Sequence, residues 1–96
     1  MAAATTAQFE IHSHAVQYVM PDGTVLAEVT FPTVDDGAVD INHTFVYESL
    51  RGQGIAGKLL EQAAQELEET GRKAHLSCSY AVRWFEKHPE RANLVT

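Results

Sequence analysis

Cysteine, long apolar runs and a leader-like N-terminus are all missing or scarce in this sequence. The single cysteine, Cys78, cannot form a disulfide within the chain, so nothing in its cysteine content indicates secretion. No apolar run reaches the ~18–20 residues that cross a bilayer. Residues 1–8 lack the basic and apolar regions of a signal peptide. We therefore expect a cytoplasmic protein with no membrane partner.

Positive charge is absent from the first fifty residues, which hold seven acidic residues and no Lys or Arg. All seven basic residues follow residue 50, and the net charge is −6. An acidic chain is not expected to bind nucleic acid, because nucleic-acid binders concentrate positive charge against phosphates. This uneven distribution of charge suits the second half to binding an anion and the first half to binding a cation. The alternative is that so few charges are distributed unevenly by chance.

Length and pattern together predict one domain. Ninety-six residues can build a single core, and 45% of them are hydrophobic. We place the domain at 9–92, between an N-terminal tail at 1–8 and a C-terminal tail at 93–96.

Beyond a candidate for a short additional strand at 9–12, the first half reads as β-strands at 15–20, 24–31 and 38–47, joined by short turns such as Pro21-Asp22-Gly23. The last of these is the longest. Its strict alternation predicts one shared face, formed by Val39, Ile41, His43, Phe45 and Tyr47.

The second half predicts a long helix, a short strand and a second helix. Apolar residues from Ile55 to Leu67 recur at 3.6-residue spacing, and Gly71 is a suitable end signal. A strand at 73–77 and a helix at 80–88, with Ser79 as its N-cap, complete the order β-β-β-α-β-α. A strand-helix-strand crossover implies that two of the strands are parallel.

Three glycines, Gly52, Gly54 and Gly57, stand where the long helix begins, although each costs roughly 1 kcal/mol of helix propensity relative to alanine. Such an entry lets a phosphate approach the unpartnered first N–H groups of the helix, and Arg51 and Lys58 add charge there. The pattern predicts a pyrophosphate cradle. It is not a Walker A loop, and it lacks the context of a Rossmann fold. The alternative is a tight connection with incidental glycines.

The stretch RGQGIA at 51–56 matches Q/R-x-x-G-x-G/A, the acetyl-CoA signature of the GNAT superfamily of N-acetyltransferases. It lies between a strand and a long helix, as it does in that superfamily. The segments NHTFVYESLRGQGIAGKLL and LSCSYAVRWFEKHPE resemble the minimal, single-domain GNAT-like proteins. The resemblance implies an α+β, GNAT-like fold with a mostly antiparallel sheet.

By this resemblance, acetyl-CoA or CoA is the cosubstrate. Backbone amides at 51–57 would bind its pyrophosphate, and the strand backbone at 44–46 would pair with its pantetheine arm. The strand and helix from Lys73 onward would splay from the long strand and admit the thioester. The implied cofactor-binding residues are Thr44, Phe45, Val46, Arg51, Gly52, Gln53, Gly54, Ile55, Ala56, Gly57 and Lys58.

The chain also departs from the family pattern. Its turns are too short for the two helices that follow the first strand in typical GNAT enzymes, and it ends soon after His88, without the final two strands. The cofactor half is thus intact and the acceptor half reduced.

Cys78, His43 and Tyr80 are the candidates for catalysis. Cys78 stands at the start of the last helix, where a thiol pKa can be lowered, so it could act as a nucleophile; the alternative is a small buried hydrophobe. Cysteine also stands at this position in the family that the chain resembles. His43 could face Cys78 as general base or be a satisfied core histidine. Tyr80 could protonate the departing thiolate, as a tyrosine near this point does in many GNAT enzymes, or simply pack.

His12 and His14 share a predicted strand face, but no third ligand accompanies them, so we expect no metal. The sequence therefore predicts acetyl transfer from acetyl-CoA to an amine. The alternatives are a CoA or acyl-CoA binding protein without turnover, and a scaffold that has lost the ligand.

Overall fold

The computed structural model describes residues 7–96. The two helices and the strand between them follow the predicted order, but five strands rather than three precede the long helix, because 9–12 forms a strand and 38–47 is divided in two. Two short 3-10 helices lie at Glu48–Leu50 and Pro89–Leu94. No helix in the described residues is long and apolar enough to span a membrane. The strands and helices are β1 Gln8–His12, β2 Ala15–Val19, β3 Val25–Thr30, β4 Val39–Ile41, β5 His43–Val46, α1 Ile55–Glu69, β6 Ala74–Leu76 and α2 Ser79–Glu86.

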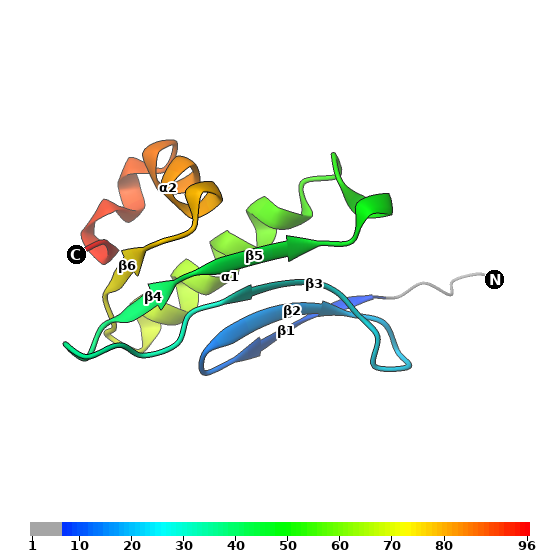
Figure 1. The fold of residues 1–96 in the computed structure, drawn as a ribbon, viewed down its shortest axis with the longest axis horizontal. Helices are drawn as coiled ribbons and strands as arrows, with labels where there is room; N and C mark the ends of the chain where they lie inside the picture. The colour runs from blue at the N-terminus through cyan, green and yellow to red at the C-terminus, as the bar shows by residue number, and fades with distance from the viewer. Residues whose placement is uncertain (1–6) are drawn as a thin grey trace.

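Two sheets form the framework. The larger is antiparallel with the order β1-β2-β3-β5, and the smaller is the parallel pair β4-β6. The parallel pair confirms the crossover through α1 that the sequence predicts. Figure 1 shows α1 lying behind the strands and α2 above β4 and β6.

The core lies between α1 and one face of the larger sheet. The apolar stripe of α1 is buried, as its spacing predicts, and it meets fully buried Val16, Ala27 and Val29 of β2 and β3. Apolar burial of this kind supplies most of the free energy that holds a helix against a sheet. No helix among the described residues covers the opposite face of the larger sheet (Figure 1). We call it the open face.

The predicted strand at 38–47 is broken at Asn42, and this changes which residues face the core. Both Asn42 and His43 lie opposite Thr30, because the Asn42 N–H donates to the Thr30 carbonyl and His43 is the register partner of Thr30. The extra residue acts as a β-bulge and reverses the alternation. Val39 and Ile41 are buried, but His43 and Phe45 are exposed. The single shared face that we expected for 39–47 is therefore wrong.

The break also separates β5 from β6. Pairing between the parallel strands ends near Ile41, whose carbonyl accepts from the N–H groups of both Ser77 and Cys78. Beyond this point β5 is an edge strand among the described residues, paired with β3 on one side and with no strand on the other. The splay between β5 and the chain after β6 is thus present.

Three boundary predictions need correction. The N-cap of α2 is Cys78 rather than Ser79, which is the first helical residue. The predicted tail at 93–96 packs against the domain, since Leu94 is buried and the Thr96 N–H donates to the Ala74 carbonyl. The predicted tail at 1–8 lies mostly outside the described residues, and β1 already begins at Gln8.

Candidate acyl-CoA site

Positive φ angles explain two of the three glycines before and within the first turn of α1. Gly52 has φ +87° and Gly54, the N-cap of α1, has φ +78°. Side chains disfavour this left-handed region, so the path of the loop requires glycine there. No atom lies within 4 Å of the place where a Cβ would stand at either position. The loop is therefore both open and conformationally restricted.

The start of α1 presents backbone donors that have no helical partner. The first helical bond at this end is from the Lys58 N–H to the Gly54 carbonyl. The amides of Ile55, Ala56 and Gly57 precede it, and no side chain caps the helix. Three unpartnered N–H groups and the positive end of the helix dipole favour an anion at this point.

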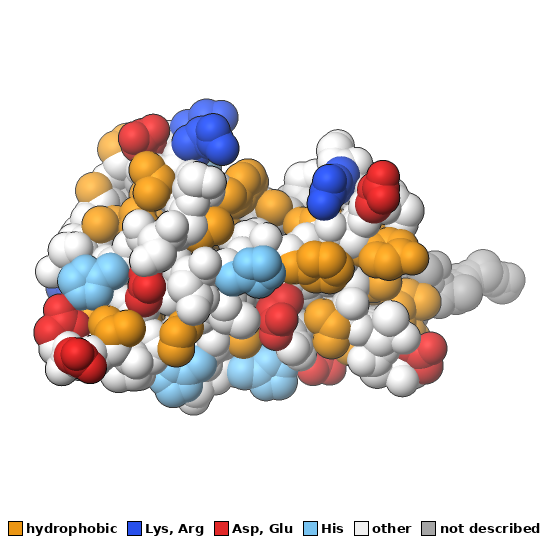
Figure 2. Space-filling model, in the orientation of Figure 1, with side chains coloured by type: hydrophobic (Ala, Val, Ile, Leu, Met, Phe, Trp, Pro, Cys, Tyr) orange, Lys and Arg blue, Asp and Glu red, His pale blue; other side chains and the backbone are white. Residues whose placement is uncertain are grey.

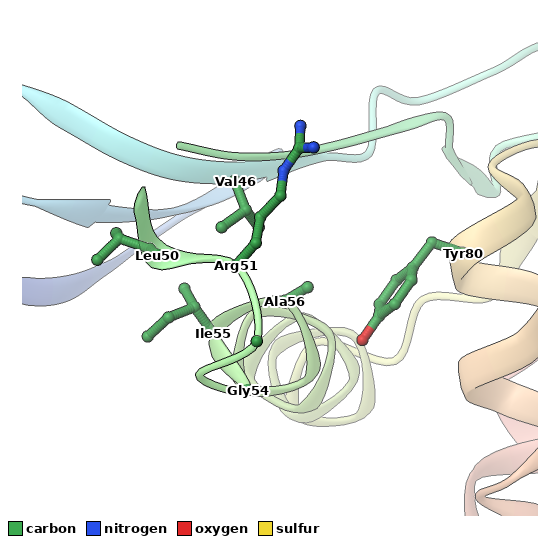
Figure 3. A pocket seen from close by; sticks show the side chains of 8 residues that line it. Val46, Leu50, Arg51, Gly54, Ile55, Ala56 and Tyr80 are labelled. Carbon is green, nitrogen blue, oxygen red and sulfur yellow. The ribbon is translucent and has the colours of Figure 1, made fainter. Parts of the chain in front are cut away.

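A cavity of about 320 Å³ adjoins these donors (Figure 3). Figure 3 shows Arg51 rising on one side of it and the hydroxyl of Tyr80 entering from α2 on the other. The volume falls in the range of small-molecule sites. Its lining combines apolar side chains of β5 and α1 with the glycine loop: Val46, Leu50, Arg51, Gly52, Gly54, Ile55, Ala56 and Tyr80.

A second cavity of about 380 Å³ continues between α1 and α2 and shares Gly54 and Tyr80 with the first. Its walls carry two lysines, Lys58 and Lys87. The rings of Trp84 and His88, which also line it, are stacked with centroids 3.9 Å apart. Neither residue was among those that the sequence predicted for the site. Their four-residue spacing within the helix predicted at 80–88 was the signal that could have paired them.

Cys78 lies at the splay, and its neighbour is Thr44. The Thr44 Oγ1 and the Cys78 Sγ are 3.6 Å apart, within hydrogen-bonding distance for sulfur. Burial raises the pKa of the Cys78 thiol, but hydrogen bonds from the Thr44 hydroxyl and from the amides of Ala81 and Tyr80 outweigh it. The net pKa lies below that of an ordinary thiol, which increases the thiolate fraction at neutral pH.

The bulge at Asn42 separates His43 from Cys78. Adjacent strand residues point to opposite faces, so Thr44 turns toward α1 and Cys78 while His43 turns to the open face. Phe45 also lies on the open face, 41% exposed, and only its backbone belongs to the edge beside the splay. The structure therefore places Thr44 beside Cys78, without His43. Tyr80 meets Cys78 only through its backbone amide, and its hydroxyl lies at the first cavity.

The remaining predicted residues of the cradle differ in whether their side chain or their backbone amide reaches the site. The Ile55 side chain packs in the core and also lines the first cavity, and its amide is one of the unpartnered donors. Gln53 is exposed, and its amide donates to the Leu50 carbonyl. Lys58 is exposed at the second cavity. Leu50, which lines the first cavity, was missed because a lone leucine in a turn gives no periodic signal.

The predicted histidine pair on β1 is not formed. His14 lies in the turn after β1, and its Nε2 is 2.9 Å from the Thr33 hydroxyl, while His12 is 3.5 Å from Glu10. Among residues 7–96, no group of three His, Cys, Asp or Glu side chains could hold a metal ion.

Residues 9–94 match the family model described as GCN5-related N-acetyl-transferase. Among solved structures, a GCN5-like protein from Staphylococcus aureus aligns with a TM-score of 0.74 at 28% identity, over 94% of this chain and 88% of that one. A ribosomal-protein-alanine N-acetyltransferase from Brucella melitensis aligns with a TM-score of 0.57 at 25% identity, over 76% of this chain and 59% of that one.

Protein NATD1 of Xenopus tropicalis and of Homo sapiens are each 35% identical to this chain over 63 residues, or 66% of it. The match spans only 58% and 56% of the length of these two curated relatives. The fold, the glycine loop and the match over 9–94 lead to one conclusion: the chain belongs to the GCN5-related N-acetyltransferase (GNAT) family.

Proposed function

We propose that this protein transfers an acetyl group from acetyl-CoA to an amine. The observation that carries the proposal is the set of unpartnered amides at the start of α1, beside a cavity that Tyr80 closes from α2. Phosphate oxygens are the natural acceptors for such donors, and a pyrophosphate can use several at once. In this arrangement the CoA phosphates lie at 52–57 and the pantetheine arm lies along the free edge of β5.

Cys78 and Tyr80 provide two routes for the chemistry at the thioester end. In the first, the Cys78 thiolate attacks the thioester carbonyl, forms a new C–S bond and releases CoA; the amine then takes the acetyl group and frees Cys78. In the second, the amine nitrogen attacks directly, the C–S bond breaks, and the Tyr80 hydroxyl gives its proton to the departing thiolate. The lowered pKa of the Cys78 thiol favours the first route.

His43 has no direct place in either route, because it lies on the face opposite Cys78. We assign it instead to the surface by which an acceptor approaches. The attacking amine is neutral in both routes, and solvent takes the proton that its nitrogen releases when the acetyl group is transferred.

The test is to mix the protein with acetyl-CoA and measure intact mass, together with release of CoA thiol in the presence of polyamines and lysine-bearing peptides. The first route predicts a gain of about 42 Da, one acetyl group, on Cys78. Cys78→Ala then abolishes transfer and leaves CoA affinity unchanged, because the phosphates bind elsewhere. Under the second route Tyr80→Phe is the damaging change.

The alternative is a CoA-binding protein without turnover. The observation in its favour is that, within residues 7–96, no helix covers the open face of the larger sheet to form a wall for an acceptor (Figure 1). Binding of CoA, with no acetylation of Cys78 or of any amine, would establish this alternative. Failure of CoA to shift the backbone amide signals of 51–58 would refute both functions.

A further inference from the structure

The open face carries a continuous band of side chains across the sheet. The β-sheet register places Glu10 opposite Gln17, Gln17 opposite Glu28, and Glu28 opposite Phe45. The Gln17 side chain donates to the Glu28 carboxylate at 2.8 Å, which confirms that these two residues share the face. We call Glu10, Gln17, Glu28 and Phe45 the cross-strand row. At ~4.8 Å per strand, the row is about 14 Å long.

Two aromatic rings are exposed at the β5 end of this row. Phe45 is 41% exposed and Tyr47, two residues further along the chain, is 53% exposed. Figure 2, which looks onto the open face, shows hydrophobic side chains gathered together with an acidic one below them. Exposed aromatic rings beside carboxylates are a suitable surface for a cation, which can contact the ring face and the carboxylate together.

The carboxylates of the cross-strand row lack the arginine partners that several carboxylates of α1 have. Arg91 contacts Glu61 and Glu68 of α1, and Arg72 contacts Glu66. In the part of the chain that the structure describes, no Lys or Arg forms such a pair with Glu10 or Glu28. Lys and Arg appear in Figure 2 mainly along the upper rim, away from the row. The negative charge of the open face is therefore available to a partner.

The row also lies beside the proposed chemistry. Phe45 follows Thr44 directly on β5, and the Thr44 hydroxyl contacts Cys78 on the other side of that strand. The splay between β5 and β6 connects the open face with Cys78. An acceptor held on the row can pass an amine by the His43 end of β5, beside the stretch that the pantetheine arm occupies.

We propose that the open face binds a lysine-bearing, basic polypeptide segment, which presents its amine to the splay beside Cys78. This inference deepens the proposed function and rests on it for the role of the bound amine. The extent of the row decides between a peptide and a small amine. One ammonium group cannot contact both Glu10 and Phe45 across about 14 Å, whereas a peptide with several lysines can.

The experiment is a titration of isotope-labelled protein with pentalysine, in the absence of CoA and at low salt. Amide signals of β3 and β5 are expected to shift, and those of 51–58 are not. Glu28→Gln and Phe45→Ala should each weaken pentalysine binding roughly two- to fivefold, the range for an exposed ion pair or cation–π contact. Glutamine at position 28 can still accept from Gln17, so the fold is retained.

Glu90→Gln is the matched control, because it removes the same charge from the 3-10 helix at Pro89–Leu94. It should leave pentalysine affinity unchanged. Shifts confined to α1, no shifts at all, or tighter binding of spermidine than of pentalysine would each overturn the proposal. The titration contains no CoA, so it is independent of the acetyl-transfer assay described above. If the protein binds pentalysine but transfers no acetyl group in that assay, only the proposed function is refuted. If it transfers acetyl groups but does not bind pentalysine, only this inference is refuted.

Discussion

Gly57→Ala separates what α1 needs for stability from what the site needs for binding. Unlike Gly52 and Gly54, Gly57 has no positive φ, so alanine fits its backbone without strain. A Cβ at this position would stand 3.8 Å from the Tyr80 hydroxyl and 4.0 Å from the Trp84 Nε1, which is ordinary contact. Alanine should therefore stabilise α1 by about 0.5–1 kcal/mol. For a domain of this size, the melting temperature should rise by about 2–8 °C.

The same methyl group should weaken CoA binding. It would stand in the crevice between α1 and Tyr80, where a phosphate must approach the Gly57 amide. A charge-assisted hydrogen bond contributes about 1.5–3 kcal/mol, so losing one should reduce affinity at least about tenfold. Calorimetric titration with CoA measures the affinity, and thermal unfolding by circular dichroism measures the stability.

Gly71→Ala is the control at the other end of α1. Gly71 has φ +69°, which disfavours alanine, and no atom lies within 4 Å of the added Cβ. It should lose about 1–2 kcal/mol of stability and keep its CoA affinity. If Gly57→Ala binds CoA as tightly as the wild type, the close approach of a phosphate to this turn is refuted.

Three further changes test other parts of the structure. Thr44→Val removes a hydrogen bond that lowers the Cys78 pKa, so alkylation of Cys78 by iodoacetamide at pH 7 should slow; an unchanged rate would contradict the assigned contact. The hydrogen bond to Asp36 raises the His75 pKa in the folded protein. This bond therefore stabilises the fold fully below about pH 6.5, the pKa of an unperturbed histidine, and the stabilisation is lost as the pH rises through the raised pKa of His75. Thermal unfolding of His75→Gln should accordingly lose less stability between pH 5 and pH 8 than the wild type, and parallel curves would refute this linkage. Arg91→Ala removes contacts that connect the C-terminal 3-10 helix to α1 and should lower the free energy of unfolding by about 1 kcal/mol in urea titrations, with no change in CoA affinity.

The two helices, the strand between them and the glycine loop could be predicted because each depends on local patterns. The apolar spacing of α1 and the turn at Pro21-Asp22-Gly23 are local signals, and the structure contains both. The glycine loop was also readable, since a positive φ at Gly52 and Gly54 leaves few other residues possible.

The bulge at Asn42 could not be predicted in the same way. Val39, Ile41, His43, Phe45 and Tyr47 alternate perfectly in the sequence, and nothing local interrupts them. The interruption comes from partners distant in sequence: β4 pairs with β6, whereas β5 pairs with β3. The face to which each side chain after Asn42 points depends on this change of partner. The sequence pattern alone therefore put His43 on the side of Cys78, whereas the structure puts Thr44 there.

The free edge of β5 has a consequence for the protein without its ligand. An unpaired strand edge exposes N–H and C=O groups that can template pairing with another chain, and natural proteins usually shield such edges. If the pantetheine arm pairs with Thr44–Val46 as proposed, this edge must stay open to it, so no permanent shield can cover it. A bound pantetheine arm would serve as a removable guard, and its loss would leave a surface prone to intermolecular strand addition. Self-association should therefore rise when CoA is stripped from the protein and fall when CoA is restored.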